Sequence, residues 1–309
     1  MYRYLMKFSY IGTQYRGLQR NGIKSDYIIN DIDTIQGALE CAFTTIIPKC
    51  INRPKLTTSS RTDVGVHAFC NAAHIDLQNT HDCLYIPSMV LEQINHYFIA
   101  CHHDIRLLDF IPVSNDFNAR RCAKSRSYVY RFMVPKDNIP YGIPIIERSH
   151  TYCFRPQNFD IERVKRATQL FLGRKNFESF SSLKKNVPTK YVKTIDRLTV
   201  EKSSPLLSID PLTNNFEFWQ IECSSKAFLY KQVRRIVTAL LNLGAGNITE
   251  KDIICMLQVP GHHNWIQSLL VAPANGLHLI NVEYSQEDID KVAIKYNEDD
   301  FKDITAVAL

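Results

Sequence analysis

The spacing of hydrophobic and polar residues predicts a chain of alternating strands and helices. Apolar side chains recur at every second position in segments 4–10 and 73–77, which is typical of half-buried strands, and residues 105–111 also read as a strand. A fourth segment of this kind, residues 128–132, places Tyr128 and Tyr130 on one face and Arg131 on the other. We therefore expect each of these segments to lie in a sheet.

Four further segments carry apolar residues at the spacing of an amphipathic helix. The predicted ends of these helices are marked by Asp33 or Thr34 before the first, Pro87 at the start of the second, Asp160 and Gly173 around the third, and Gly244 after the fourth. Helices of this type cover one face of a sheet. The alternation of strands and helices thus favours a layered α+β protein.

The strand pattern that ends near Pro112 suggests where the chain divides. We expect an N-terminal half in residues 1–112, a C-terminal half in residues 113–284 and an acidic extension in residues 285–309. Because the extension is rich in acids, we expect it to be mobile or loosely helical.

The composition is that of an ordinary folded protein. Of 309 residues, 45% are apolar and 22% are charged, which excludes the disordered and fibrous classes. No run approaches the roughly 18 consecutive apolar residues of a membrane span. Strand-like sequence begins almost at once, so no signal or transit peptide is readable at the N-terminus. We therefore expect no membrane partner.

Charge is unevenly distributed along the chain. Residues 285–309 contain seven acids against three lysines, so the net charge of +6 divides into −4 in this tail and +10 in residues 1–284. A basic body favours a phosphate-bearing partner. Within it, a run of lysines either forms a solvated surface or follows RNA phosphates: Lys184, Lys185, Lys190 and Lys193.

The nine cysteines include no Cys-x-x-Cys pair, and their neighbours are mostly apolar. This pattern predicts reduced, mostly buried thiols in an intracellular compartment. A zinc site would draw on His102, His103, His262 or His263, but the paired spacing of zinc ligands is missing. No metal is therefore expected.

A polar loop at residues 59–68 holds one carboxylate between two strand patterns. Its sequence is Ser-Ser-Arg-Thr-Asp-Val-Gly-Val-His-Ala, with the carboxylate at Asp63 and a turn-forming glycine at Gly65. A carboxylate in this position would be held rigidly and presented outward. One alternative is an Asx-turn in which Asp63 bonds its own backbone. Another is a hydrolase that pairs Asp63 with His67 or His74, although no nucleophile–base pattern is recognisable.

This loop resembles the catalytic loop of the TruA-type tRNA pseudouridine synthases, whose signature is Arg-Thr-Asp-Ala-Gly-Val-His. Its continuation through Asn71-Ala72-Ala73-His74 is most similar to the animal tRNA pseudouridine synthase-like subgroup. Further motifs follow in family order, and the resemblance covers roughly residues 2–284. They lie at residues 12–19 (with Leu18 where Trp is usual), 117–130, 173–180, 228–236 and 272–284.

The resemblance implies the pseudouridine synthase fold, in which a mixed, mostly antiparallel sheet carries flanking helices and two related halves enclose a central cleft. It implies isomerisation of specific uridines to pseudouridine in tRNA, in a tRNA-like stem or in mRNA, without a cofactor. A homodimer is the default for the family. The animal subgroup suggests a mitochondrial location, with cytoplasm or nucleus as alternatives.

The resemblance also assigns roles to individual residues. Asp63 is the expected catalytic carboxylate, and Arg61 would fill the space left by a flipped base or hold its phosphate. Tyr128 would stack on the uracil, and Arg234 would pair with Asp63. The remaining residues expected along the bound RNA are Gly65, His67, Arg120, Arg126, Lys184 and Lys185.

Two broader alternatives remain open at this point. From periodicity alone, the strand at 128–132 reads as a core aromatic face with solvated arginines. The chain could also be a catalytically silent RNA-binding protein that has kept the synthase fold. Retention of Asp63, Tyr128 and Arg234 together argues against a silent protein.

Overall fold

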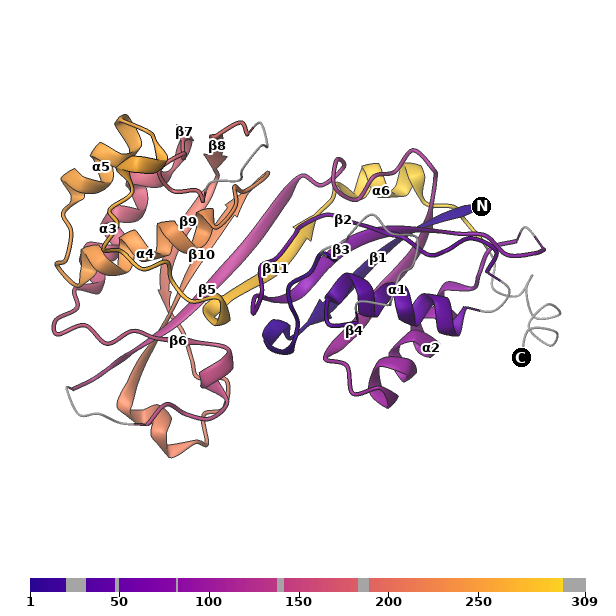
Figure 1. Cartoon of the computed structure of the whole chain (residues 1–309), viewed down its shortest axis with the longest axis horizontal. Helices are drawn as coiled ribbons and strands as arrows, with labels where there is room; N and C mark the ends of the chain where they lie inside the picture. The colour runs from indigo at the N-terminus through magenta and orange to yellow at the C-terminus, as the bar shows by residue number, and fades with distance from the viewer. Residues whose placement is uncertain (21–31, 48–49, 82, 138–141, 183–188, 297–309) are drawn as a thin grey trace. The chain divides into compact units, whose positions relative to one another are not determined.

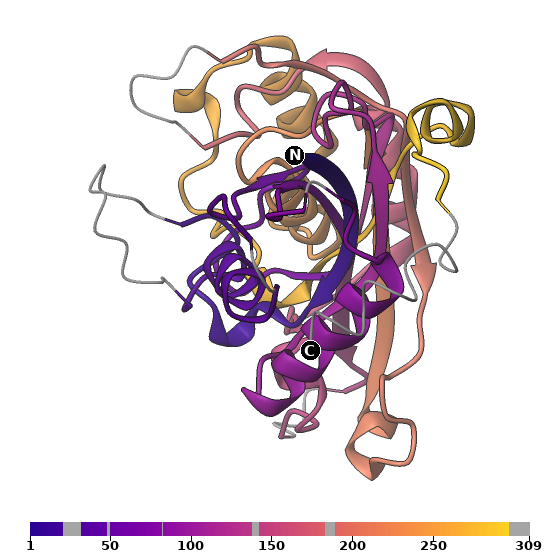
Figure 2. The ribbon, with the colours of Figure 1, turned by 90° about the vertical axis from the view of Figure 1, so that its right-hand side faces the viewer.

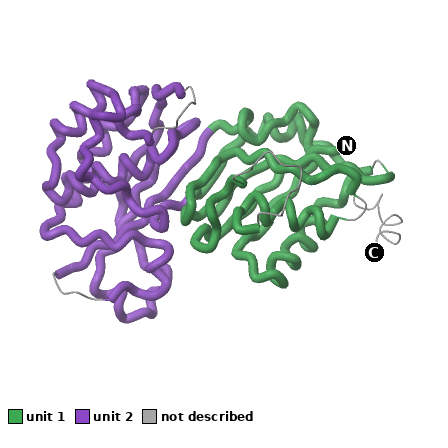
Figure 3. Tube along the Cα trace, in the orientation of Figure 1, with its two compact units in different colours: residues 1–124, 279–309 green, residues 125–278 purple. Residues whose placement is uncertain are grey.

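The computed structural model describes residues 1–20, 32–47, 50–81, 83–137, 142–182 and 189–296. The chain forms two compact units (Figure 3). Unit 1 contains residues 1–124 and 279–309, and unit 2 contains residues 125–278. The proposed seam at Pro112 lies within strand β4 (Ile105–Val113), and the compact units divide at a later residue. The two functional halves therefore remain a prediction.

Unit 1 is an α+β layer built on antiparallel strands (Figures 1 and 2). The strand order is β4-β1-β3, and β11 lies next to β3. Helices α1 and α2 pack against each other, and α2 packs against β4. The elements are β1 (Tyr2–Tyr10), α1 (Ile35–Ile46), β2 (Leu56–Thr58), β3 (His67–Leu77), α2 (Pro87–Ala100), β4, β11 (Leu277–Glu283) and α6 (Gln286–Val292), with a short 3-10 turn at Gly12–Gln14.

Aromatic side chains fill the space between the strands and helices of unit 1. The Tyr4 and Phe110 rings stack at 4.6 Å, and Phe43 of α1 lies 5.7 Å from Phe110. Thr34 rather than Asp33 caps α1, since the Thr34 hydroxyl accepts the Gly37 N–H at 3.1 Å. The predicted start of α2 at Pro87 is confirmed.

Unit 2 contributes further antiparallel strands, in the order β5-β10-β9, with β6 parallel to β5, and a separate two-stranded sheet of β7 and β8. Helices α3 and α4 pack together and contact these strands (Figure 1). The elements are β5 (Ser125–Pro135), β6 (Tyr152–Cys153), α3 (Ile161–Ala167), β7 (Gly173–Asn176), β8 (Val192–Ile195), β9 (Arg197–Lys202), β10 (Phe216–Ser225), α4 (Gln232–Gly244) and α5 (Glu250–Gln258). Short 3-10 turns lie at Glu147–Ser149, Thr168–Phe171, Pro211–Asn215, His262–Asn264 and Ala274–Gly276.

The prediction that Gly244 caps α4 is wrong, because this glycine has another role. Gly244 is the last helical residue, and a Cβ on it would lie 2.5 Å from the Val164 side chain and 2.7 Å from Phe159. The glycine therefore allows α3 to approach α4 closely. The left-handed residue that ends the helix is Gly246, at φ +79°.

The first part of the acidic extension is ordered against unit 1. The Ser114 N–H donates to the Val292 carbonyl at 2.7 Å, and the Ile294 N–H donates to the Pro112 carbonyl at 2.9 Å. These bonds add an antiparallel bridge to the end of β4, the edge strand of the sheet. The segment is therefore tied down rather than mobile over the residues that the structure describes. Within those residues, no helix is long and apolar enough to cross a bilayer.

We predict that a chain ending at Tyr284 is less stable than one ending at Tyr296. The shorter chain loses both hydrogen bonds to β4 and uncovers the edge of that strand. Its free energy of unfolding should fall by about 1–3 kcal/mol, and it should aggregate at lower concentration. Urea unfolding and light scattering of both chains measure this. Equal stability of the two chains would show that the segment contributes nothing.

Candidate active site

The loop between β2 and β3 is fixed by polar side chains from neighbouring strands. The Asn71 amide on β3 donates to the Ser60 carbonyl at 3.1 Å. The Tyr10 and Thr62 hydroxyls lie 2.7 Å apart, and Ser60 and Thr62 are both buried. Buried polar groups need such partners, so these contacts specify one conformation of the loop.

Asp63 begins a tight turn at the end of this loop. The Val66 N–H donates to the Asp63 carbonyl at 3.2 Å, and Gly65 takes a positive φ of +76°, as the third residue of a type II turn does. Asp63 is half-buried and Val64 is exposed. The turn is therefore closed by its own backbone, which holds the Cα of Asp63 in a defined place.

The turn after β1 packs directly on the Asp63 loop. A Cβ on Gly12 would lie 2.0 Å from the Val66 carbonyl oxygen. Gly17 takes a φ of +95°, and a Cβ there would lie 3.4 Å from the Thr62 carbonyl oxygen. The two glycines thus allow a backbone-to-backbone approach that no other residue type permits.

His67 supports this contact from within the core of unit 1. It is fully buried, and its Nδ1 accepts the Gly12 N–H at 3.1 Å. The ring thus supports the loop, and its expected contact with RNA stays a prediction. His74 is also buried and uses its Nδ1 to accept the Ala119 N–H. In both rings, Nδ1 is therefore used to hold backbone.

A second segment of unit 1 brings Arg120 towards the Asp63 loop. Ala119 is held on both sides, because its N–H donates to His74 at 3.1 Å and its carbonyl accepts the Tyr284 hydroxyl at 2.6 Å. Partial burial and the positive charge of Arg120 lower the pKa of Arg61. The two guanidinium groups therefore feel each other's charge, and an anion between them would relieve the repulsion.

His74 is a neutral imidazole at ordinary pH. Burial and the nearby Arg3 guanidinium lower its pKa to about 4, while Asp76 opposes the shift. Arg3 itself is bound to Asp76 through two short contacts, at 2.6 and 2.8 Å. The neutral ring is also what the Ala119 N–H requires, since a protonated Nδ1 cannot accept a hydrogen bond.

In unit 2, Tyr128 lies on β5 and is 8% exposed. Its ring meets Phe228 edge-on at 5.3 Å. The neighbouring Tyr130 is fully buried and donates its hydroxyl to the Pro273 carbonyl at 2.9 Å. The predicted aromatic face of this strand is confirmed.

Arg234 is fastened to the chain segment that precedes β11. Its Nε donates to the Ala272 carbonyl at 2.7 Å. Thr238, one turn along α4, donates to the Arg234 carbonyl and accepts the Ala272 N–H at 2.7 Å. The residue before the helix, Lys231, takes a left-handed φ of +60°, which is uncommon outside glycine. These contacts therefore hold the first turn of α4, and Arg234 within it, against the segment that precedes β11.

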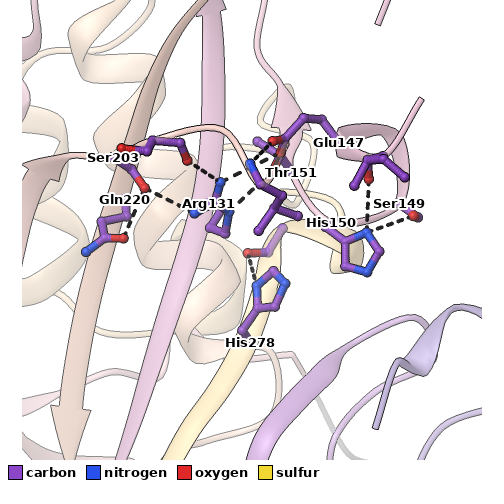
Figure 4. Close-up of polar contacts among 12 residues, drawn as sticks. Arg131, Glu147, Ser149, His150, Thr151, Ser203, Gln220 and His278 are labelled. Atoms are coloured by element: carbon purple, nitrogen blue, oxygen red, sulfur yellow. Dashed lines mark hydrogen bonds and ion pairs between the residues drawn. The ribbon is translucent and has the colours of Figure 1, made fainter. Parts of the chain in front are cut away.

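The arginines of β5 are not solvated. Arg126 is buried and donates to the Lys226 carbonyl at 2.5 Å. Its expected contact with RNA stays a prediction. Arg131 lies against Glu147 at 3.7 Å and donates to Ser203 and Ser204 at 3.1 and 2.8 Å (Figure 4). Burial lowers the pKa of Arg131, and Glu147 opposes this shift.

The expected RNA-binding lysines and the histidines considered as zinc ligands need separate comment. Lys184 and Lys185 fall in residues 183–188, outside the described part of the chain. Among described residues, no group of three or more His, Cys, Asp or Glu is placed to hold a metal ion. His103 instead lies 3.0 Å from the Tyr15 hydroxyl, and His262 lies 3.2 Å from that of Tyr191.

Sequence reasoning missed the residues that position the candidate catalytic groups. Asn71, Tyr284 and Thr238 hold the loop, the Arg120 segment and the Arg234 segment respectively. Asn71 and Tyr284 lie within motifs quoted for the family resemblance. A polar residue amid apolar strand positions was the available signal for Asn71.

Comparison with known proteins gives consistent matches. Residues 167–285 match a family model described as tRNA pseudouridine synthase. The chain is 31% identical to tRNA pseudouridine synthase-like 1 of Xenopus laevis over 93% of each protein. It is 32% identical to the Homo sapiens protein of the same name, over 91% of this chain and 90% of the relative. It is also 29% identical to tRNA pseudouridine synthase A of Agrobacterium fabrum, over 92% of this chain and 93% of the relative.

We predict that the pKa of His74 makes stability depend on pH. In the unfolded chain the ring binds a proton near pH 6.5, whereas in the folded protein it does so only near pH 4. The unfolded state therefore holds more protons between these values, and stability should fall as the pH drops through this window. Urea unfolding at a series of pH values measures the slope.

The variant His74→Asn separates this residue from other titrating groups. An Asn carbonyl can accept the Ala119 N–H but cannot be protonated in this range, so the slope between pH 6.5 and 5 should flatten. His96→Asn, at an exposed position of α2, is the control and should keep the wild-type slope. An unchanged slope in His74→Asn would show that this ring does not titrate as inferred.

Proposed function

This chain belongs to the TruA-type tRNA pseudouridine synthase family, and we propose that it isomerises specific uridines in tRNA to pseudouridine. The observation that supports this most directly is the Asp63 loop. A half-buried carboxylate stands on a turn that is closed by its own backbone and backed by β1 and β3. Rigid presentation of one reacting group is what catalysis requires.

The reaction needs no external reagent. The bond between N1 of uracil and C1′ of ribose breaks, and a bond between C5 and C1′ forms. C5 loses a proton and N1 gains one, so atoms and charge balance. The residues must therefore hold the nucleotide, stabilise the detached base and move a proton. The base must also leave its stack to be reached.

In this proposal Asp63 is the catalytic carboxylate, acting on the ribose. Arg61 and Arg120 hold the phosphate of the flipped nucleotide. The phosphate-binding role of these two arginines is supported by the effect of the Arg120 charge, which lowers the pKa of Arg61. An anion between the two guanidinium groups would neutralise this repulsion. Gly65 contributes through its backbone, because the turn that carries Asp63 needs its positive φ.

Tyr128 and Arg234 complete the proposed catalytic set. Tyr128 has its ring edge against Phe228, which would hold the ring in place for stacking on the uracil. Arg234 is held through Nε on the Ala272 carbonyl, so its guanidinium has a fixed direction in which to meet a carboxylate. In the proposal that carboxylate is Asp63.

We propose further that the protein works as a homodimer. Seven aliphatic side chains are exposed on two loops of unit 2: Ile143, Ile145, Ile146, Leu206, Leu207, Ile209 and Leu212. The loops are joined by Glu147, which accepts the Leu206 N–H at 2.5 Å and holds Arg131 (Figure 4). Exposed apolar groups gathered in this way favour a protein interface.

Substrate and compartment belong to the same proposal. A tRNA, or a tRNA-like stem in another RNA such as an mRNA, is the proposed substrate. The mitochondrial compartment is supported only by similarity to the animal subgroup. Pseudouridine mapping of total and mitochondrial RNA, from cells with and without the protein, distinguishes these possibilities.

We predict that Asp63→Ala abolishes pseudouridine formation while RNA affinity stays close to that of the wild type. Loss of the reacting carboxylate should lower the rate about a thousandfold or more. Product is measured in purified tRNA, and affinity by filter binding. Asp196→Ala removes an exposed acid of unit 2 and should leave the rate unchanged. If Asp63→Ala forms pseudouridine at the wild-type rate, the proposal is refuted. If the wild-type protein binds RNA but forms no pseudouridine, the alternative of a silent RNA-binding protein is favoured.

We predict that Ile145→Asp with Ile209→Asp yields a monomer at concentrations where the wild type is a dimer. A carboxylate at two positions that are 81% and 83% exposed should not disturb the fold but should oppose an apolar interface. Sedimentation velocity measures the mass. Leu270→Asp, at a position 86% exposed, is the control and should remain dimeric. A wild-type monomer would refute the dimer proposal without touching the reaction.

A further inference from the structure

A basic groove in unit 2 is not used by the proposed chemistry. It has a volume of about 540 Å³ and is bordered by β7, β8 and the chain that follows β10. These elements lie together in unit 2 (Figure 1). Four of the lining residues are cations, namely Arg174, Lys190, Lys193 and Lys226, and none is an acid.

The walls of the groove are held by specific contacts. The Ser225 hydroxyl donates to the Thr194 carbonyl at 2.6 Å, which joins the end of β10 to β8. The buried Arg126 donates to the Lys226 carbonyl and so fixes the position of that residue. Tyr191 on the same wall lies 3.2 Å from His262 through its hydroxyl. The groove is therefore a formed feature of unit 2 rather than a chance arrangement of long side chains.

Within the described residues, the four cations make no ion pair. Arg197 lies near Glu201 of its own strand β9 at 3.7 Å and near Glu222 of the neighbouring β10 at 3.3 Å. The strand pair adds to the excess, because Lys175 lies directly opposite Lys193 in the register of β7 and β8. Like charges placed opposite each other destabilise a strand pair. A bound anion would remove this cost.

The ligand that fits is a polyanion with separated charges. One phosphate could neutralise only part of four cations spread along a groove, whereas successive phosphates of a nucleic-acid strand could meet several. Three of the four are lysines, which act as point charges and suit backbone binding without base selection.

The groove also adjoins the segment that carries the proposed stacking residue. Lys226 lies two positions before Phe228, whose ring contacts Tyr128. On the paired strand, Arg126, which holds Lys226, lies two positions before Tyr128. A strand in the groove would therefore run close to the nucleotide stacked on Tyr128.

We propose that this groove binds backbone phosphates of the substrate RNA next to the target uridine. The proposal rests on the proposed function and adds a second phosphate site to that of Arg61 and Arg120. It assigns to Lys193 and Lys226 a role in holding RNA and none in bond breaking.

The test compares two double variants that remove equal charge. Lys193→Gln with Lys226→Gln alters the groove, and Lys136→Gln with Lys202→Gln alters exposed lysines at the other end of β5 and β9. Affinity for a tRNA transcript is measured by filter binding over a range of salt concentrations. The groove variant should bind about tenfold more weakly, with a salt slope lower by roughly one to two, while the control should match the wild type.

Single-turnover kinetics separate binding from chemistry. In the groove variant, the RNA concentration giving half the maximal rate should rise about tenfold, and the rate at saturating RNA should stay within about twofold of the wild type. Affinity and half-saturation equal to those of the control would overturn the groove proposal. A lowered saturating rate with unchanged half-saturation would also overturn it.

Two further measurements separate loss of charge from structural damage, and RNA binding from catalysis. The double variant Lys193→Arg with Lys226→Arg keeps both positive charges and should bind RNA with nearly wild-type affinity. If it binds as weakly as the glutamine variant, the loss of affinity was structural and the proposal is overturned. If the wild type binds RNA but converts no uridine, the proposed function fails while the groove can still be confirmed by affinity. Wild-type conversion with no groove effect overturns the groove proposal alone.

Discussion

Unit 1 depends on the close approach of two backbones, the turn after β1 and the loop that carries Asp63. The approach is possible because Gly12 and Gly17 have no side chains, and the contact is closed by the His67 ring on the Gly12 N–H. Buried hydroxyl and amide groups of Tyr10, Thr62 and Asn71 then satisfy the polar atoms that the approach removes from water. These contacts hold the backbone that carries the Asp63 carboxylate in one conformation.

Backbone contacts also position Arg120, the second cation of unit 1. His74 and Tyr284 hold Ala119 from two sides, and Arg120 is the next residue. In unit 2, Thr238 and the Arg234 side chain hold Ala272 in the same manner. In both units, a charged side chain expected to meet the substrate is oriented by neutral groups that bind main chain.

Local signals in the sequence predicted much of this fold. Two-residue periodicity located β1 and β3, and Thr34 and Pro87 marked helix starts because caps act through the nearest backbone atoms. Local signals were less informative where distant parts of the chain decide the structure. α3 packs closely on Gly244, and the buried His67 ring accepts the N–H of Gly12 in the turn after β1. Both facts depend on residues far away in the sequence. The Asp63 loop was identifiable only because its residues form a contiguous string.

The path of the chain has a consequence for synthesis. Unit 1 is interrupted, since the chain leaves it after Lys124 and returns only with Leu279. At about 5–20 residues per second, a ribosome takes roughly ten to thirty seconds to make the intervening residues 125–278. During this interval the first part of unit 1 waits without β11 beside β3 and without the Tyr284 hydroxyl on Ala119. Unit 2, in contrast, is one continuous stretch and can complete its fold first. A nascent chain therefore exposes the flank of β3 to chaperones until the segment that begins at Leu279 has been made.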